Sequence, residues 1–250
     1  MSYLTQLRRG VPVCQCCFMS NSLLEVIALD AEDARAAVAG GADRLELVSS
    51  MEFSGFNPPV GQFAAVRAAV DVPLRVMIRL RDGFLAGGPE ALEELTASVH
   101  GLRAAGADEF VLGWLDERGA VDLAAVETVV KALDGAHWTF HKAIDASADR
   151  GALFAAVRGL PGLDTVLTSG GPFPAGQGVE VLAAEAAREA SLRETGLRLL
   201  VGGGLKLADV PALRAAGLHE FHIGTAARTG GTWSGPIDPD LVAAWRNAVD

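Results

Sequence analysis

From residue 24 onward, short runs rich in aliphatic and β-branched residues alternate with alanine-rich segments that have the period of a helix. Strands that alternate with helices pair in parallel through right-handed crossovers. The alternation occurs eight times, at about 28 residues per unit, which predicts a single (βα)8 TIM-like barrel. The predicted strands are 24–29, 44–48, 74–80, 109–115, 138–141, 165–168, 197–201 and 220–223.

The segments between these strands carry helix start and stop signals. Several end in an Ala-Gly step, as in Ala105-Gly106, where glycine supplies the left-handed residue that ends a helix. The predicted helices are 31–39, 60–70, 89–105, 122–133, 148–158, 178–194, 207–216 and 239–249. An open doubly wound sheet is the alternative, but no GxGxxG follows the first strand. No linker divides the chain, so we predict one barrel over 23–250 and a short flexible N-terminal extension over 1–22.

Composition excludes several classes of protein. Half of the residues are hydrophobic, which excludes a disordered chain, and the net charge of −10 argues against a nucleic-acid binder. No run of 18 apolar residues predicts a membrane span. The three cysteines all lie within residues 14–17, which excludes a disulfide-stapled secreted fold. We therefore expect a cytoplasmic protein with neither nucleic-acid nor membrane partners.

In a barrel of this kind, functional side chains lie at the carboxyl ends of the strands. The acid–base candidates there are His141, Glu46 and Asp145, because histidine and carboxylate side chains can exchange protons with a substrate. The ligand-binding candidates are Glu25, Arg79, Arg81, Ser169, Gly203, Gly204, Gly224 and Thr225. Backbone amides in the two glycine-rich turns can hold a phosphate or another small anion, although such turns also occur for steric reasons alone.

Strand alternation places Glu25 on the same face of the first strand as Ile27 and Leu29, and a carboxylate buried inside a strand without a partner is costly. An inward Glu25 or Glu46 therefore needs a cation, and Arg79 or Arg81 is expected to supply it. Two interpretations stay open: an internal layer of salt bridges, or the polar floor of a ligand pocket. Glu25, Glu46, His141 and His222 can also be considered as a divalent-metal group, but nothing in their spacing requires one.

Several segments, read in order, carry a family resemblance. They include LLEVIAL, GGADRLELVSS, RVMIRLRDGF, WTFHKAID and VLTSGG. The chain resembles the CutC family over about residues 23–227, most specifically at Phe140–Asp145, which is similar to the family's TFHRAFD, and at Val166–Gly170. The resemblance implies a cytoplasmic TIM-like barrel that self-associates as a homo-oligomer, and a proposed role in handling copper. It implies no defined enzymatic reaction.

The chain departs from that family at the positions proposed to bind copper. Members with proposed copper ligation carry cysteines at the ends of the first and second strands, where this chain has Ile27-Ala28 and Val48. Copper(I) prefers thiolate and thioether ligands, so a barrel site here cannot work through thiolate. The retained polar residues suit an anionic organic ligand better.

The N-terminal extension has its own soft donors. Cys14, Cys16 and Cys17 lie close to Met19, and this group could hold a copper or zinc ion. Two plainer interpretations also stand: a flexible tail, or translation that starts at Met19 and omits residues 1–18.

Two hypotheses for function follow from these observations. The first is a copper-binding protein of copper homeostasis, supported by the resemblance and the N-terminal cysteines. The second is an enzyme or sensor for a small phosphorylated or carboxylated metabolite, with isomerase or lyase chemistry. In the second hypothesis Arg79 and Arg81 clamp the anion, the amides of the glycine-rich turns cradle it, and His141 or Glu46 moves a proton.

Overall fold

The computed structural model describes residues 22–51, 55–191 and 196–250. Within these residues eight parallel strands close into a barrel, each paired with its neighbours in chain order, and β8 pairs with β1. The predicted (βα)8 architecture is confirmed. The strands are β1 (Leu23–Ala28), β2 (Arg44–Leu47), β3 (Leu74–Met77), β4 (Glu109–Leu112), β5 (His137–Phe140), β6 (Leu163–Thr168), β7 (Arg198–Gly202) and β8 (Glu220–Ile223).

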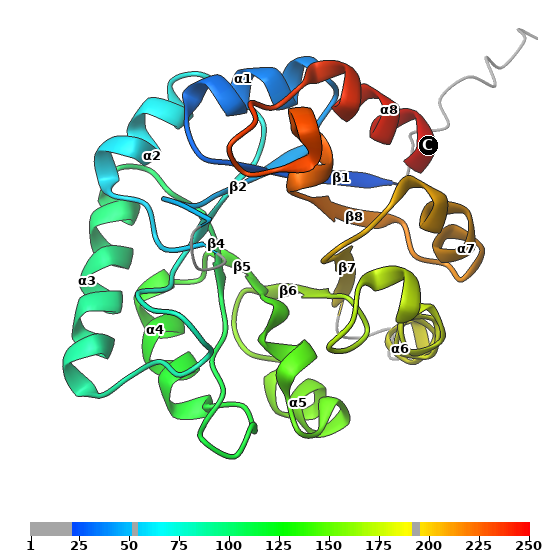
Figure 1. Ribbon diagram of the computed structural model, residues 1–250. Helices are drawn as coiled ribbons and strands as arrows, with labels where there is room; N and C mark the ends of the chain where they lie inside the picture. Colours follow the sequence, from blue (N-terminus) through cyan, green and yellow to red (C-terminus); the bar gives the residue numbers. More distant parts are fainter. Residues whose placement is uncertain (1–21, 52–54, 192–195) are drawn as a thin grey trace, which may run out of the picture.

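A ring of helices surrounds the barrel, and each helix follows its strand around the outside (Figure 1). They are α1 (Ala31–Ala39), α2 (Val60–Arg67), α3 (Pro89–Ala104), α4 (Leu123–Leu133), α5 (Arg150–Val157), α6 (Val179–Ser191), α7 (Val210–Ala215) and α8 (Pro239–Val249). Short 3-10 helices lie in the loops: η1 (Lys142–Ala146), η2 (Ala175–Gln177), η3 (Leu207–Asp209), η4 (Thr225–Ala227) and η5 (Thr229–Gly231).

The strands alternate two kinds of side chain because successive residues face opposite sides of the sheet. In β1, Leu24 and Val26 are fully buried in the apolar layer between the sheet and the helices. Glu25 and Ile27 belong to the other face, and Ile27 packs with inward residues such as Met77. The outer layer supplies most of the hydrophobic burial, which leaves the interior free to carry polar groups.

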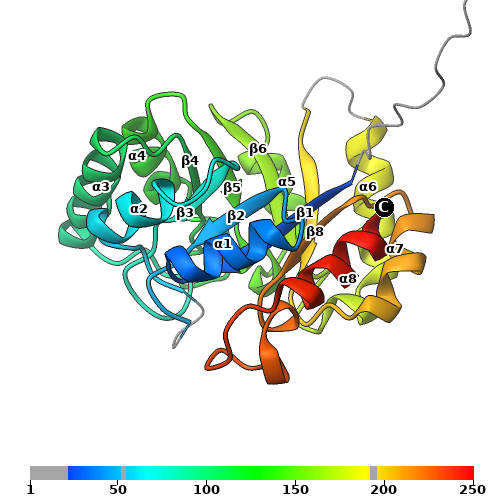
Figure 2. The same cartoon turned by 90° about the horizontal axis from the view of Figure 1, so that it is seen from above.

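The chain closes the ring by packing α8 beside α1 (Figure 2). Asp30 caps α1 by accepting hydrogen bonds from the amides of Glu32 and Asp33, both at 2.9 Å. At the other end of α1, a Cβ on Gly40 would lie 2.5 Å from the carbonyl oxygen of Pro239. A glycine here therefore allows the two helices to approach closely.

Two strands end three residues earlier than the sequence predicts. β3 ends at Met77 rather than at residue 80, and β4 ends at Leu112 rather than at residue 115. The residues beyond β4 join loops instead: the Leu115 amide donates to the carbonyl oxygen of Phe84 at 2.8 Å. The predicted extension of residues 1–22, with Cys14, Cys16 and Cys17, lies outside the described residues except for its last position.

Candidate functional site

A cavity of about 260 Å³ opens at the carboxyl ends of the strands. Its wall includes seven of the residues predicted to form the site, contributed by the ends of five strands or the loops that follow them. They are Glu46, Arg79, His141, Gly203, Gly204, Gly224 and Thr225. The carboxyl ends of all strands meet on one face of the barrel, and this brings together residues that are up to 179 positions apart in the chain.

The other predicted residues lie outside this wall. Arg81 is exposed, because β3 ends four residues earlier and the chain has left the barrel. Ser169 is fully buried and hydrogen-bonded to neighbouring groups. Glu25 is buried on β1 beside Glu46 and His222, which do line the cavity. Asp145 is also absent from the lining.

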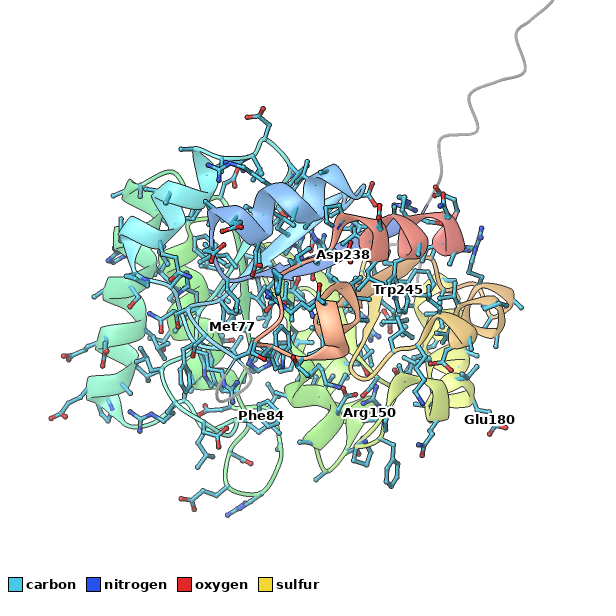
Figure 3. All side chains as sticks on the ribbon, turned by 45° about the horizontal axis from the view of Figure 1, so that its top comes forward. Met77, Phe84, Arg150, Glu180, Asp238 and Trp245 are labelled. Carbon is cyan, nitrogen blue, oxygen red and sulfur yellow. The ribbon has the colours of Figure 1, made fainter. Side chains whose placement is uncertain are left out.

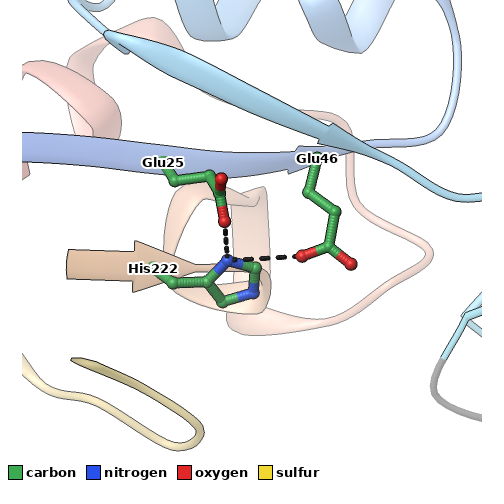
Figure 4. Close-up of side chains that lie close together, drawn as sticks. All are labelled: Glu25, Glu46 and His222. Carbon is green, nitrogen blue, oxygen red and sulfur yellow. Dashed lines mark hydrogen bonds and ion pairs between the residues drawn. The ribbon is translucent and has the colours of Figure 1, made fainter. Parts of the chain in front are cut away.

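Beside the cavity, Glu25 is the centre of a buried ionic cluster. Its carboxylate accepts a hydrogen bond from Arg44 Nε at 2.5 Å. It also contacts His222 Nδ1 at 2.7 Å (Figure 4). Burial opposes ionisation of Glu25, but Arg44 and His222 more than offset it and hold the pKa of Glu25 well below its usual range. Burial also opposes a charge on His222, yet its carboxylate neighbours raise the pKa of the imidazole.

This cluster corrects one expectation. The cations that pair with Glu25 are Arg44 and His222, not Arg79 or Arg81. Arg79 instead donates to the carbonyl oxygen of Gly83 at 2.9 Å, and its guanidinium lies 5.6 Å from the centre of the Phe84 ring. Arg79 also lies 3.5 Å from the Asp82 carboxylate, so groups of the loop after β3 hold it at the edge of the cavity.

Glu46 is the carboxylate in the cavity wall. It is 2% exposed, and its Oε2 lies 3.5 Å from His222 Nδ1 and has no hydrogen-bond partner among the described residues. Burial, with the nearby charge of Glu25, raises the pKa of Glu46 to about 7, although His222 and Arg44 act in the opposite direction. A carboxyl group in this state can both take and give a proton near neutral pH.

His141 stands at the end of β5 and is 4% exposed. The amide of Ala143 donates to its Nδ1 at 3.2 Å, while its Nε2 has no partner among the described residues. Burial and the nearby charge of Arg79 lower the pKa of His141 to about 3. The ring is therefore neutral at physiological pH.

Asp145 holds together the ends of β5 and β6. Its carboxylate accepts from Lys142 Nζ at 2.9 Å, from Arg150 Nη1 at 2.9 Å and from Thr168 Oγ1 at 2.6 Å. The Ser169 amide and hydroxyl donate to it as well, both at 2.9 Å. Although burial opposes ionisation, Lys142 and these hydrogen bonds lower the pKa of Asp145. The group is ionised and saturated with donors, which fits a role in positioning Lys142 rather than in proton transfer.

The turn after β7 supplies an anion-binding feature together with Lys142. Gly203 and Gly204 both have positive φ, at 96° and 63°. A Cβ on Gly203 would lie 2.3 Å from Lys142 Nζ, so the turn and the ammonium group are in close contact. The amides of Gly203, Gly204 and Thr225 donate to no acceptor among the described residues. These groups together favour a small anion.

Several lining residues were missed by the sequence analysis. Met77 and Phe84, both labelled in Figure 3, line the cavity with Lys142 and Trp233. Met77 stands two residues before Arg79, so strand alternation could have identified it. Phe84 and Trp233 come from loops, where no periodicity reports which way a side chain faces.

The predicted divalent-metal group is smaller in the structure. One ligand atom each from Glu25, Glu46 and His222 lies within 4.8 Å of the others, whereas His141 is not part of this group. Arg44 already neutralises Glu25, and a second cation at this place would lie beside its guanidinium. The three residues have donor atoms that suit a metal ion, but their surroundings suit an internal ion pair better.

Comparison with known proteins identifies the family. The model of the CutC family matches residues 22–227, which is most of the chain. The chain belongs to the CutC family. Curated relatives named CutC include one from Xylella fastidiosa, 38% identical over 200 residues that cover 80% of this chain and 73% of the relative. Another, from Xanthomonas campestris pv. campestris, is 39% identical over 202 residues, which cover 80% of this chain and 81% of the relative.

A solved structure agrees in fold. The crystal structure titled as a putative copper homeostasis protein CutC from Streptococcus agalactiae superposes with a TM-score of 0.73. It covers 81% of this chain and 98% of that one, at 21% sequence identity, which is evidence for the shared barrel alone. Among the described residues of this CutC family member, no helix is long and apolar enough to cross a membrane.

Proposed function

We propose that this CutC family member binds a small phosphorylated or carboxylated metabolite in the cavity and transfers a proton on it, with Glu46 as the acid–base group. One observation carries the proposal. A single cavity wall combines fixed cations and unpaired amides with a buried carboxyl group whose pKa is about 7. Perturbed carboxyl groups in a cleft mark candidate catalytic sites.

The anion end of the site is formed by Arg79, Lys142 and the turn at Gly203-Gly204. Asp145 and Ser169 hold Lys142 Nζ at 2.9 and 2.8 Å, so the ammonium group is placed before a ligand arrives. The net charge of −10 does not oppose anion binding, because these groups act at short range. The remaining wall is largely apolar and suits a compact organic molecule.

Glu46 gives the site its chemistry. Its position in the wall, the absence of a hydrogen-bond partner for its Oε2 among the described residues, and its pKa of about 7 favour a reaction in which a proton is removed from carbon and returned, as in isomerases and lyases. No cofactor is required for such a step.

Inorganic phosphate is the probe for the anion site, with binding measured by titration calorimetry. Arg79→Met removes a charged donor, which is worth about 1.5–3 kcal/mol or roughly a 10- to 100-fold loss in affinity. Arg81→Met is the matched control, because Arg81 is exposed and outside the cavity lining. Equal losses in the two variants, or no phosphate binding by the unmodified protein, would refute the proposed anion site.

Copper binding is the second candidate function. Its support is membership of the CutC family, with a structural neighbour titled as a putative copper homeostasis protein. The described residues contain no cysteine, so thiolate ligation would have to use Cys14, Cys16 and Cys17, which lie outside them. Copper(I) strongly prefers such soft ligands.

A copper(I) titration against a competing chelator, under reducing conditions, tests this candidate. The full chain is compared with a variant in which Cys14, Cys16 and Cys17 are replaced by serine. Tight binding by the full chain alone would assign copper to the N-terminal cysteines. Binding by both would assign it to the barrel, and binding by neither would exclude a copper(I) role for this chain.

A further inference from the structure

Two buried polar atoms in the cavity wall have no hydrogen-bond partner among the described residues. One is Oε2 of Glu46 on β2, and the other is Nε2 of His141 at the end of β5. Burying a polar group without a partner costs folding free energy, so native proteins rarely keep two such atoms in one cavity. A bound ligand that supplies both partners would remove this cost.

The chemical character of the two atoms differs, and the backbone determines it for His141. The amide of Ala143 donates to Nδ1, so Nδ1 carries a lone pair rather than a proton. A neutral imidazole has one proton, which must then be on Nε2. Nε2 of His141 is therefore a hydrogen-bond donor without a partner among the described residues, whereas Glu46 offers an acceptor when it is ionised.

The surroundings keep His141 in this state. Its ring packs against Phe84, with the ring centres 5.6 Å apart, and against Phe140, at 6.1 Å. Arg79 is the charged group that acts on it, and together with burial it lowers the pKa of His141 to about 3. A ring this difficult to protonate is a poor base near neutral pH, so we assign removal of the proton from carbon to Glu46 rather than to His141.

We infer that the metabolite bound by this cavity carries a carbonyl group next to a C–H bond, and that His141 donates its Nε2–H to the carbonyl oxygen while Glu46 removes the proton from carbon. The inference rests on the proposed function and narrows its substrate class. The C–H electron pair forms a carbon–carbon double bond and the carbonyl electrons move to oxygen, which gives an enolate and a protonated Glu46. When the carbon that loses its proton also bears a hydroxyl group, the hydroxyl proton moves to the enolate oxygen. Return of the proton from Glu46 to the former carbonyl carbon then gives the isomeric carbonyl compound, without any co-reactant.

The placement of the two groups fits this reaction. β2 and β5 are separated by two strands of the closed barrel, so Glu46 and His141 reach the cavity from different sides. Met77, Phe84 and Trp233 supply apolar wall around them, and exclusion of water strengthens a hydrogen bond to a developing oxyanion. A neutral imidazole donor beside a carboxylate base is a known arrangement for enolisation.

Nitrogen-15 NMR of the histidine side chains in the full chain tests the state of His141 directly, without a substrate. We expect an Nε2-protonated neutral ring from pH 5 to pH 9. A proton on Nδ1, or protonation of the ring within that range, would overturn the inference. The titration with inorganic phosphate tests the proposed anion site independently of this NMR result.

The reaction is tested with dihydroxyacetone phosphate, which carries a phosphate, a carbonyl and adjacent C–H bonds. Proton NMR in deuterated water measures exchange of those hydrogens. His141→Gln places an amide N–H near the Nε2 position, and His141→Asn places its amide near the Nδ1 position. We expect exchange by the unmodified protein, a rate within about tenfold for His141→Gln, and a loss of about 100- to 1000-fold for His141→Asn, the cost of removing one oxyanion donor.

Glu46→Gln should abolish the exchange, since it removes the base. If the unmodified protein binds inorganic phosphate but exchanges no deuterium, the inference is wrong while the proposed anion site survives. Equal rates for His141→Gln and His141→Asn would also overturn it, provided that both variants give the circular dichroism spectrum of the unmodified protein. A variant that does not fold leaves the decision to the NMR measurement above.

Discussion

Replacing His141 with glutamine should make the stability of the barrel less sensitive to acid. In the folded protein, burial and Arg79 lower the pKa of His141 to about 3, against 6.5 for an unperturbed histidine. The folded state therefore favours the neutral ring. This contribution to stability is fully present above pH 6.5, and it is lost progressively as the pH falls toward 3, because the unfolded chain takes up the proton first.

The size of the effect follows from these two values. Each pH unit between 6.5 and 3 costs the unmodified protein about 1.36 kcal/mol. Between pH 7 and pH 4.5, His141 alone should remove about 2.5 kcal/mol of the free energy of unfolding. Other groups whose pKa values differ between the two states, including His222 and Glu46, are common to both proteins and cancel in the difference.

Urea unfolding at pH 7, 6, 5.25 and 4.5 measures this difference. The His141→Gln protein should lose less stability than the unmodified protein over this range, by about 2.5 kcal/mol. His100→Gln is the control, because His100 is exposed on α3, and its stability should follow that of the unmodified protein at every pH. If the free energy of unfolding changes with pH in the same way for His141→Gln and the unmodified protein, His141 is not held neutral by folding. That result would also contradict the tautomer assigned to His141.

Three substitutions test other parts of the site. Asp145→Asn should lower the free energy of unfolding by about 2–3 kcal/mol and weaken phosphate binding, since Lys142 loses its charged anchor; an unchanged phosphate affinity would contradict this positioning role. Glu25→Gln should cost about 3–5 kcal/mol in urea unfolding, because it leaves Arg44 buried without a counter-ion; a loss below 1 kcal/mol would mean that water or another carboxylate compensates. Gly203→Ala should weaken phosphate binding, measured by calorimetry, since its Cβ would displace Lys142 Nζ; full retention of affinity would place the anion elsewhere.

The fold could be predicted from the sequence because its signals are local. Each strand and helix shows its own periodicity, and features such as Asp30 at the start of α1 and Gly106 after α3 act within one turn. Strand ends were less predictable. Apolar residues continue past Met77 and Leu112, but there the chain leaves the sheet, and hydrophobicity does not distinguish a strand from a buried loop.

Some of the residues that line the cavity could also be predicted from the sequence. A barrel places all eight carboxyl ends of its strands on one face, so counting from each strand end found Glu46, Arg79, His141 and the glycine-rich turns. The same counting included Arg81, which failed because β3 is short. Loop residues such as Trp233 were missed, since nothing in the pattern says which loop folds back over the barrel.

Pairings across strands could not be predicted from the sequence, because they depend on register. Glu25 lies opposite Arg44 of β2 and His222 of β8, and only closure of the barrel brings β8 beside β1. Strand alternation therefore selected Arg79 or Arg81 as the cation, whereas the partners in the structure are 19 and 197 residues from Glu25. Buried ion pairs require exact placement as well as opposite charge.

His141 and Asp145 have different roles, and the sequence did not predict this because the difference depends on the η1 turn between them. Both were predicted as acid–base candidates, but the η1 turn between them carries Asp145 to the end of β6, where Thr168 and Ser169 donate to it. The same turn directs the Ala143 amide at Nδ1 of His141 and so determines which ring nitrogen holds the proton. One short turn thus makes the carboxylate a structural anchor and the imidazole a fixed donor, which leaves Glu46 as the cavity residue able to exchange a proton near neutral pH.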